Sequence, residues 1–227
     1  MIAAGRVSVN GEIAGLGRRV ETLYDRVELD GALVPASPAL VYYLLNKPRG
    51  VVSTARDPGR RTAVLDLVPP SPRVFPVGRL DVDTEGLLVL TNDGDLAHRV
   101  MHPSHGVEKE YLAEVLGTPS RKAVRLLSDG VDLEDGRTAP AKVRLVSPGV
   151  LKIVVHEGRK RQVRRMCAAV GHPVVRLVRT RIGPIADPHL APGKWRSLEA
   201  VEVHGLAAAA AGSPRGPYGS FHDPAGH

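Results

Sequence analysis

From residue 41 onward, the spacing of apolar and polar positions predicts a mixture of strands and helices. Short runs rich in Val, Leu and Ile predict strands at 41–45, 51–54, 87–90, 107–116, 141–146, 151–156 and 174–182. Apolar residues at helical spacing predict helices at 62–67, 95–101, 121–128 and 160–170. Segment 197–206 fits a last helix or a last strand. The pattern indicates one mixed α/β domain over most of the chain.

The two ends of the chain have different patterns from this middle part. Before residue 35, short apolar runs flank Asn10-Gly11 and Asp30-Gly31, which predicts small hairpins that turn at these dipeptides. The Pro-containing segment 35–38 is typical of a linker. From residue 207 the chain is Ala, Gly, Ser and Pro without periodicity, which is typical of a disordered tail. We therefore expect a small module at 1–36, a main domain at 41–206 and a tail at 207–227.

The predicted strand 107–116 separates two kinds of side chain. Side chains alternate between the faces of a strand, so Lys109 and Tyr111 share one face. The acidic residues Glu108, Glu110 and Glu114 lie on the other face. A lysine and an aromatic ring therefore point together, away from the carboxylates.

The predicted helix 160–170 has one apolar stripe. Its members lie three, four and seven residues apart: Val163, Met166, Cys167 and Val170. Arg161 and Arg165 lie opposite this stripe. Because each helical residue advances by about 100°, Arg164 lies roughly a quarter-turn from the stripe, at the boundary between core and solvent. We expect its guanidinium to reach along the wall of a cleft.

The net charge of +7 is concentrated in one part of the chain. Segment 157–181 holds eight basic side chains against the single carboxylate of Glu157. They are Arg159, Lys160, Arg161, Arg164, Arg165, Arg176, Arg179 and Arg181. Residues 1–40, by contrast, hold four basic and five acidic side chains. A concentrated basic patch favours a polyanionic partner such as nucleic acid.

Several protein classes fit this sequence poorly. The single cysteine, Cys167, allows no internal disulfide and fits a reducing cytosol. No apolar run approaches the about 20 residues of a membrane span, and no secretory leader is recognisable. We expect a cytoplasmic protein that does not associate with membranes.

Asp81 is the candidate for chemistry. It follows Gly78-Arg79-Leu80, so an apolar neighbour can partly desolvate the carboxylate while an arginine lies two residues away. Such a carboxylate suits a nucleophile or a base. The nearby acids Asp83 and Glu85 lack the spacing of a calcium loop, and the histidines lack ligand spacing. We therefore expect no metal and no cofactor.

Three ordered stretches resemble a known family. They are 78–88 (GRLDVDTEGLL), 109–111 (KEY) and 157–166 (EGRKRQVRRM). Together, over about 41–206, the chain resembles the RsuA/RluB-type pseudouridine synthases, which modify ribosomal RNA. Segment 101–104 (MHPS) resembles the large-subunit, RluB-like branch of this family.

The resemblance implies an α+β fold: a mixed, largely antiparallel sheet with flanking helices and a central RNA-binding cleft. It implies that Asp81 is the catalytic carboxylate, that Tyr111 stacks on the target base and that Arg164 pairs with Asp81. Leu177 matches the apolar residue of the cleft wall. Together with the basic patch, it assigns RNA binding to these residues: Arg79, Lys109, Leu177, Arg159, Lys160, Arg161, Arg165, Arg176 and Arg179.

The implied partner is ribosomal RNA of the large subunit (23S), free or in a ribosome assembly intermediate, and the expected state is a monomer. No cofactor is implied, since the isomerisation needs no redox step. The start of the chain resembles the second half of an S4-like RNA-binding module. Met1 matches a position inside the module's second helix, so we expect a partial module at 1–36.

Alternatives remain at the sequence level. A non-catalytic RNA-binding or ribosome-assembly protein could share the fold, and a metal-dependent nuclease could use Asp81, Asp83 and Glu85. Only the enzyme needs Asp81, Tyr111 and Arg164 together. Two roles of Asp81 also stay open: attack on C1′ of the sugar, or removal of a sugar proton to give a glycal.

Overall fold

The computed structural model describes residues 1–20, 25–34, 39–54, 59 and 61–211. The chain divides into two compact units, Met1–Leu40 and the part that begins at Val41. The predicted linker 35–38 and the predicted tail from residue 212 lie outside the described residues. In the described parts, no helix combines the length and the apolar character that crossing a bilayer requires.

The first unit is a small antiparallel sheet with the strand order β2-β1-β3-β4. Its elements are η1 (Ile2–Ala4), β1 (Val7–Val9), β2 (Glu12–Ile13), β3 (Val27–Leu29) and β4 (Ala32–Leu33). Asn10 and Gly11 both have positive φ, as do Asp30 and Gly31, which is the conformation of two-residue hairpin turns. The two predicted hairpins are confirmed. That this unit is part of an RNA-binding module stays a prediction.

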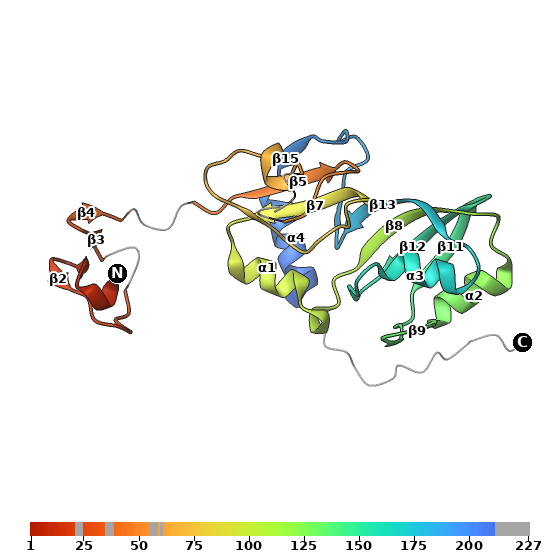
Figure 1. The fold of residues 1–227 in the computed structure, drawn as a ribbon, viewed down its shortest axis with the longest axis horizontal. Helices are drawn as coiled ribbons and strands as arrows, with labels where there is room; N and C mark the ends of the chain where they lie inside the picture. The colour runs from red at the N-terminus through yellow and green to blue at the C-terminus, as the bar shows by residue number, and fades with distance from the viewer. Residues whose placement is uncertain (21–24, 35–38, 55–58, 60, 212–227) are drawn as a thin grey trace, which may run out of the picture. The chain divides into compact units, whose positions relative to one another are not determined.

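The second unit is built on a nine-stranded sheet with the order β11-β12-β8-β13-β7-β5-β15 (Figure 1). Two short strands, β6 and β14, pair with β7 and β13 respectively. The strands are β5 (Tyr42–Lys47), β6 (Phe75–Pro76), β7 (Glu85–Thr91), β8 (Lys109–Val115), β11 (Lys142–Ser147), β12 (Val150–Val155), β13 (Val174–Ile182), β14 (Ile185–Ala186) and β15 (Trp195–Ser197). The ribbon of β9 (Asp132–Leu133) and β10 (Gly136–Arg137) is separate.

One parallel pair joins the two halves of this sheet. β7 runs parallel to β13, with Gly86 opposite Arg179, and the other strand pairs are antiparallel. The predicted α+β fold with a mixed, largely antiparallel sheet is confirmed. The close crossing explains the glycine, because Gly86 has φ +110° and a Cβ there would clash with the backbone carbonyl oxygen of Arg179.

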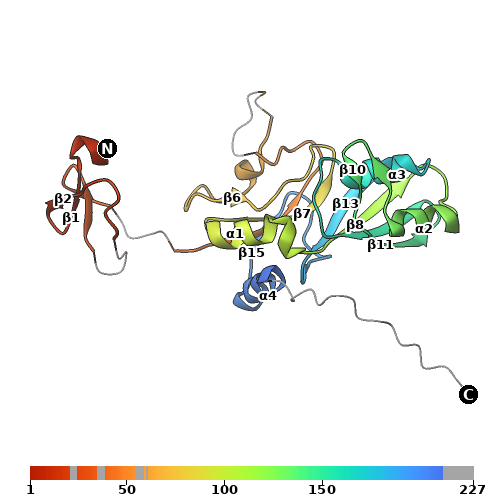
Figure 2. The same ribbon diagram turned by 90° about the horizontal axis from the view of Figure 1, so that it is seen from below.

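Two groups of helices pack on one face of the sheet (Figure 2). The helices are η2 (Val64–Leu67), α1 (Gly94–Met101), η3 (Pro103–His105), α2 (Arg121–Asp129), α3 (Gln162–Ala169) and α4 (Ala200–Ala211). α1 and α4 bury Leu96 and Leu206 against β5 and β7, while α2 and α3 bury Leu127 and Met166 against β8 and β12. η2 packs in a separate core cluster with Leu88 and other residues of β5 and β7. The cleft described below lies between α1 and α3.

Some predicted boundaries differ from the structure. The predicted strand 51–54 is a single bridge at Val52, and helix 160–170 begins only at Gln162. Segment 197–206 is the end of a strand followed by a helix. The prediction of a disordered tail from residue 207 is wrong up to Ala211, because α4 continues to that residue and buries Ala210. Alanine is the best helix former, so an Ala-rich run without strong periodicity can still extend a helix that packs on a core.

Candidate active site

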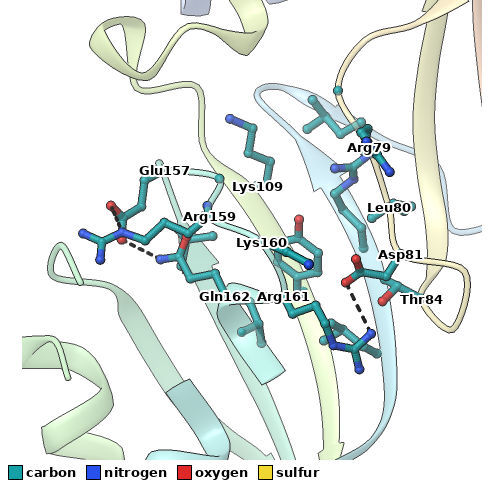
Figure 3. Close-up of a pocket in the computed structure, with 18 of the residues that line it drawn as sticks. Arg79, Leu80, Asp81, Thr84, Lys109, Glu157, Arg159, Lys160, Arg161 and Gln162 are labelled. Atoms are coloured by element: carbon teal, nitrogen blue, oxygen red, sulfur yellow. Dashed lines mark hydrogen bonds and ion pairs between the residues drawn. The ribbon is translucent and has the colours of Figure 1, made fainter. Parts of the chain in front are cut away.

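A cleft of about 690 Å³ lies on the face of the sheet between α1 and α3 (Figure 3). Its floor comes from β8 and β13, and one wall is the loop 78–84 that precedes β7. It is lined by these predicted site residues: Arg79, Asp81, Lys109, Tyr111, Arg159, Lys160, Arg161, Leu177 and Arg179. Arg164, Arg165 and Arg176 do not line it. The fold thus brings together segments separated by about a hundred residues of sequence.

The backbone on both sides of Asp81 is fixed by hydrogen bonds. The buried Ser53 hydroxyl donates to the carbonyl oxygen of Leu80 (2.9 Å) and accepts from its N–H (3.2 Å). The N–H of Gly50 donates to the carbonyl oxygen of Val82 (2.7 Å). Within the loop, the N–H of Thr84 donates to the carbonyl oxygen of Asp81 (3.0 Å). The carboxylate therefore projects from a rigid support.

Arg161 is the arginine nearest to the Asp81 carboxylate. Its Nη1 lies 4.0 Å from Oδ2 of Asp81, and the side chain makes a two-pronged contact with Asp83 at 3.1 and 3.0 Å. Arg161 precedes α3 with φ +50°, a conformation that is uncommon for a residue with a side chain. Such backbone strain clusters at functional sites, and here it aims a guanidinium at the loop of Asp81.

Arg164 does not pair with Asp81, and that prediction is wrong. Its Nη2 donates to the backbone carbonyl oxygen of Asp83 (2.8 Å) and lies 3.5 Å from the Asp83 carboxylate. The same nitrogen lies 3.4 Å from Oγ1 of Thr84. The position of Arg164 between core and solvent was predicted, but a backbone carbonyl leaves no signal in the sequence. Arg164 supports the loop, whereas Arg161 faces the carboxylate.

The other acids near Asp81 are held by arginines. Burial favours the neutral form of Asp83, but the hydrogen bond from Arg161 and the charge of Arg164 outweigh it and lower the pKa. The hydrogen bond from Arg176 lowers the pKa of Glu85. In the part of the chain that the structure describes, no three His, Cys, Asp or Glu side chains are grouped as metal ligands.

Tyr111 and Lys109 both face the cleft from β8, as their alternation predicts. Glu108 and Glu110, on the other face of the strand, pair with basic residues there. The nitrogens of Lys142 and Lys152 lie 2.6 and 3.0 Å from them. In the register of β8 and β13, Arg179 is directly opposite Tyr111. The cleft floor therefore carries one aromatic ring with two cations beside it.

The predicted basic patch is divided and partly neutralised. Arg165 is held by Asp135 (2.8 and 2.9 Å), and Arg176 is held by Glu85 (2.9 Å) outside the cleft. Arg159 contacts Glu157 (3.3 Å) and donates to carbonyl oxygens of 135–137. These five segment residues lie near carboxylates: Arg159, Arg161, Arg165, Arg176 and Arg181. Exposed Lys160 has no ion-pair partner among the described residues.

Leu177 and Arg179 are buried in the floor of the cleft, each with 4% exposure. Leu177 contributes apolar surface, as the resemblance implies. Arg179 is not part of a solvent-facing patch, which corrects the interpretation of its charge. Its Nε donates to the carbonyl oxygen of Leu87 (2.7 Å), so the guanidinium lies inside the cleft rather than on a surface.

Sequence reasoning missed Lys47 and Ser53. Lys47 is fully buried behind the loop, where its Nζ donates to the carbonyl oxygens of Pro48 (3.0 Å) and Val51 (2.7 Å). Burial lowers its pKa to about 8, against the charges of Asp83 and Asp81. A lysine at the end of an apolar strand resembles an ordinary turn residue. Cys167, by contrast, is core as predicted, and burial raises its pKa to about 12.

A cleft with a carboxylate, a tyrosine ring and several cations is typical of enzymes that act on one nucleotide of an RNA. A family model described as RNA pseudouridylate synthase matches residues 41–169. The chain therefore belongs to the RNA pseudouridylate synthase family, and the enzymes of this family isomerise uridine to pseudouridine.

Individual relatives agree with this assignment. The chain is 43% identical to a ribosomal large subunit pseudouridine synthase B of Bacillus subtilis, over 92% of this chain and 88% of that protein. It is 42% identical to a protein of the same name from Salmonella typhimurium, over 91% and 75%. A solved structure titled crystal structure of pseudouridylate synthase has a TM-score of 0.71 and 32% identity, and covers 90% of each chain.

Proposed function

We propose that this chain isomerises one uridine of large-subunit (23S) ribosomal RNA to pseudouridine, with Asp81 as the catalytic carboxylate. The observation that carries the proposal is the cleft itself. Asp81 projects into it from a loop fixed by Ser53, Gly50 and Arg164. Tyr111 faces the same space from the floor. The names of the relatives support ribosomal RNA of the large subunit as substrate.

The chemistry needs one anionic oxygen next to the sugar. The bond between N1 and C1′ breaks, the uracil turns, and C5 bonds to C1′. Asp81 can attack C1′, as glycosidase carboxylates do, or remove the C2′ proton so that a glycal forms. Either role uses the carboxylate with the Arg161 guanidinium 4.0 Å away. No electron acceptor is needed, because the product is an isomer of the substrate.

Tyr111 is proposed to stack on the target base. An enzyme that reaches C1′ of a paired or stacked nucleotide has to flip it out, at a cost of a few kcal/mol. Stacking of a base on an aromatic ring contributes roughly 1–3 kcal/mol, which offsets much of that cost. The tyrosine is also placed to accept the C5 proton once C5 has bonded to the sugar.

The RNA backbone is proposed to follow the mouth of the cleft. Arg79, Lys160 and Arg161 line it and are exposed, so phosphates can reach them. Arg165 and Arg176 lie outside the cleft lining and are held by carboxylates, so they contribute less. We propose that the enzyme works as a monomer in the cytoplasm, on free ribosomal RNA or on an assembly intermediate.

Mapping of pseudouridines in ribosomal RNA tests the proposal. Cells that lack the gene should lose one pseudouridine of the large-subunit RNA, and the wild-type gene should restore it. The Asp81→Asn variant should not restore it. The matched control Asp129→Asn, which changes an exposed aspartate on α2, should restore it fully. An unchanged pseudouridine map in the deletion strain would refute the proposed substrate.

A further inference from the structure

Two cations in the floor of the cleft have no carboxylate partner. Arg179 is 4% exposed, and its Nη2 is buried without a hydrogen-bond partner in the described part of the chain. The ammonium group of Lys109 likewise makes no hydrogen bond or ion pair with any described residue. Lys109 projects into the cleft between Arg79 and Glu157 (Figure 3). Neither side chain is thus satisfied by the protein that surrounds it.

This arrangement is unlike that of the neighbouring arginines, most of which contact a carboxylate. A buried polar or charged group without a partner is costly, so it usually has a function. Burial, reinforced by the charge of Arg179, lowers the pKa of Lys109 to about 8. A site with two unpaired cations, closed off from solvent, suits an anion that arrives with the substrate.

The strand register places both cations beside the tyrosine ring. Arg179 is opposite Tyr111 across the β8–β13 pair, and Lys109 is two residues from Tyr111 on the same face. Directly opposite residues have Cβ atoms about 4.5–5.5 Å apart. A uracil stacked on Tyr111 would therefore have its edge, where O2 and O4 lie, within reach of both cations.

The isomerisation produces an anion of that shape. When the bond between C1′ and N1 breaks, its electron pair stays with the uracil and spreads over N1, O2 and O4. C1′ is then bonded to the Asp81 carboxylate, or the sugar has given its C2′ proton to that carboxylate. Both routes release the same uracil anion, and reaction of its C5 with C1′ consumes it. Nothing is oxidised or reduced.

We propose that Arg179 and Lys109 form a site for the uracil anion that exists between bond cleavage and reattachment through C5. The proposal rests on the proposed function and deepens it. Cations fixed before the reaction begins stabilise the developing charge without reorganisation, which is usually the largest catalytic effect. They would also retain the free base while it turns.

Ligand binding tests the site without any catalysis. Isothermal titration of the full chain would compare 5-nitrouracil, an anion at neutral pH, with uracil, which is neutral. Hydrogen bonds to charged groups contribute about 1.5–3 kcal/mol, so the anion should bind roughly tenfold tighter or more. Lys109→Met should remove most of this preference and Lys109→Arg should keep it. The control Lys122→Met, on the exposed side of α2, should change nothing.

Two results would overturn the proposal. One is equal affinity of the wild-type protein for 5-nitrouracil and uracil. The other is displacement of 5-nitrouracil by dimethyl phosphate, which would assign the site to the RNA backbone. If the wild-type protein shows the preference but modifies no ribosomal RNA, the proposed substrate fails while the anion site stands.

Single-turnover kinetics on modifiable RNA separates the same alternatives. A role in stabilising the leaving base predicts that Lys109→Met lowers the rate constant about 10²-fold, while the dissociation constant of the RNA is unchanged. A weaker dissociation constant with an unchanged rate constant would contradict the proposal.

Discussion

At the scale of single residues, the two arginines near Asp81 have different tasks. Arg161 is partly exposed and faces the carboxylates of Asp81 and Asp83. Arg164 is more buried and binds the backbone of the loop through the carbonyl oxygen of Asp83. A substitution at one position should therefore affect chemistry, and a substitution at the other should affect the folded loop as well.

Arg164→Met should lower both stability and activity. A buried carbonyl oxygen that loses its donor costs about 1–3 kcal/mol, and the Asp81 loop loses its anchor. Arg161→Met is the matched control. Because its side chain is largely exposed, the free energy of unfolding should change little while kcat falls. Urea denaturation and single-turnover kinetics of both variants would measure this, and equal losses of stability would contradict the distinction.

Lys47 predicts a pH dependence of stability. Its pKa is about 8 in the folded state and near 10.5 when exposed, so between these values the unfolded state binds more protons. Stability contributed at this residue should therefore rise as the pH increases through that window. The wild type should gain stability relative to Lys47→Met between pH 7 and pH 9.5. Urea denaturation at both pH values measures this, and a constant difference would contradict the burial of a titrating amine.

At the scale of elements, the crossing of β7 and β13 sets the site. It joins Gly86 to Arg179 and so brings the loop of Asp81 beside the cleft floor. The strand 174–182 was predicted with its correct bounds, and the face shared by Lys109 and Tyr111 was predicted from alternation alone. The parallel pairing was not predictable, because nothing local in either strand specifies its partner.

Gly86→Ala should be strongly destabilising. The new Cβ would meet the backbone of Arg179, which cannot move without breaking the strand pair, and the residue has φ +110°. Gly94→Ala is the control, since a Cβ at that helical glycine meets nothing within 4 Å. It should be neutral or stabilising by up to about 1 kcal/mol. Thermal unfolding of the two variants would compare them, and similar melting temperatures would contradict the close approach.

At the scale of the whole molecule, the charge of the chain overstates its free cationic surface. The sequence showed where the basic residues are concentrated but not which of them meet carboxylates. Asp135 and Glu85 are far from Arg165 and Arg176 in sequence, and only the fold brings them together. The motif residues of the site could be predicted from the sequence, whereas the division of labour among arginines depended on tertiary contacts.

Salt dependence of RNA binding tests this division. Each phosphate contact that is lost should reduce the slope of log K against log salt by about 1. Lys160→Met should do so, because the side chain lines the cleft and has no ion-pair partner among the described residues. Arg165→Met should change the slope less, because Asp135 already neutralises that charge. Equal changes in slope, measured by filter binding, would contradict the assignment.

The central claim is that the carboxylate of Asp81 carries out the isomerisation. The most direct measurement is single-turnover pseudouridine formation in large-subunit ribosomal RNA by wild-type protein and Asp81→Asn, with the RNA dissociation constant measured in parallel. The account predicts that the variant binds RNA as the wild type does and forms no detectable pseudouridine. Pseudouridine formed by Asp81→Asn at a rate near that of the wild type would contradict it.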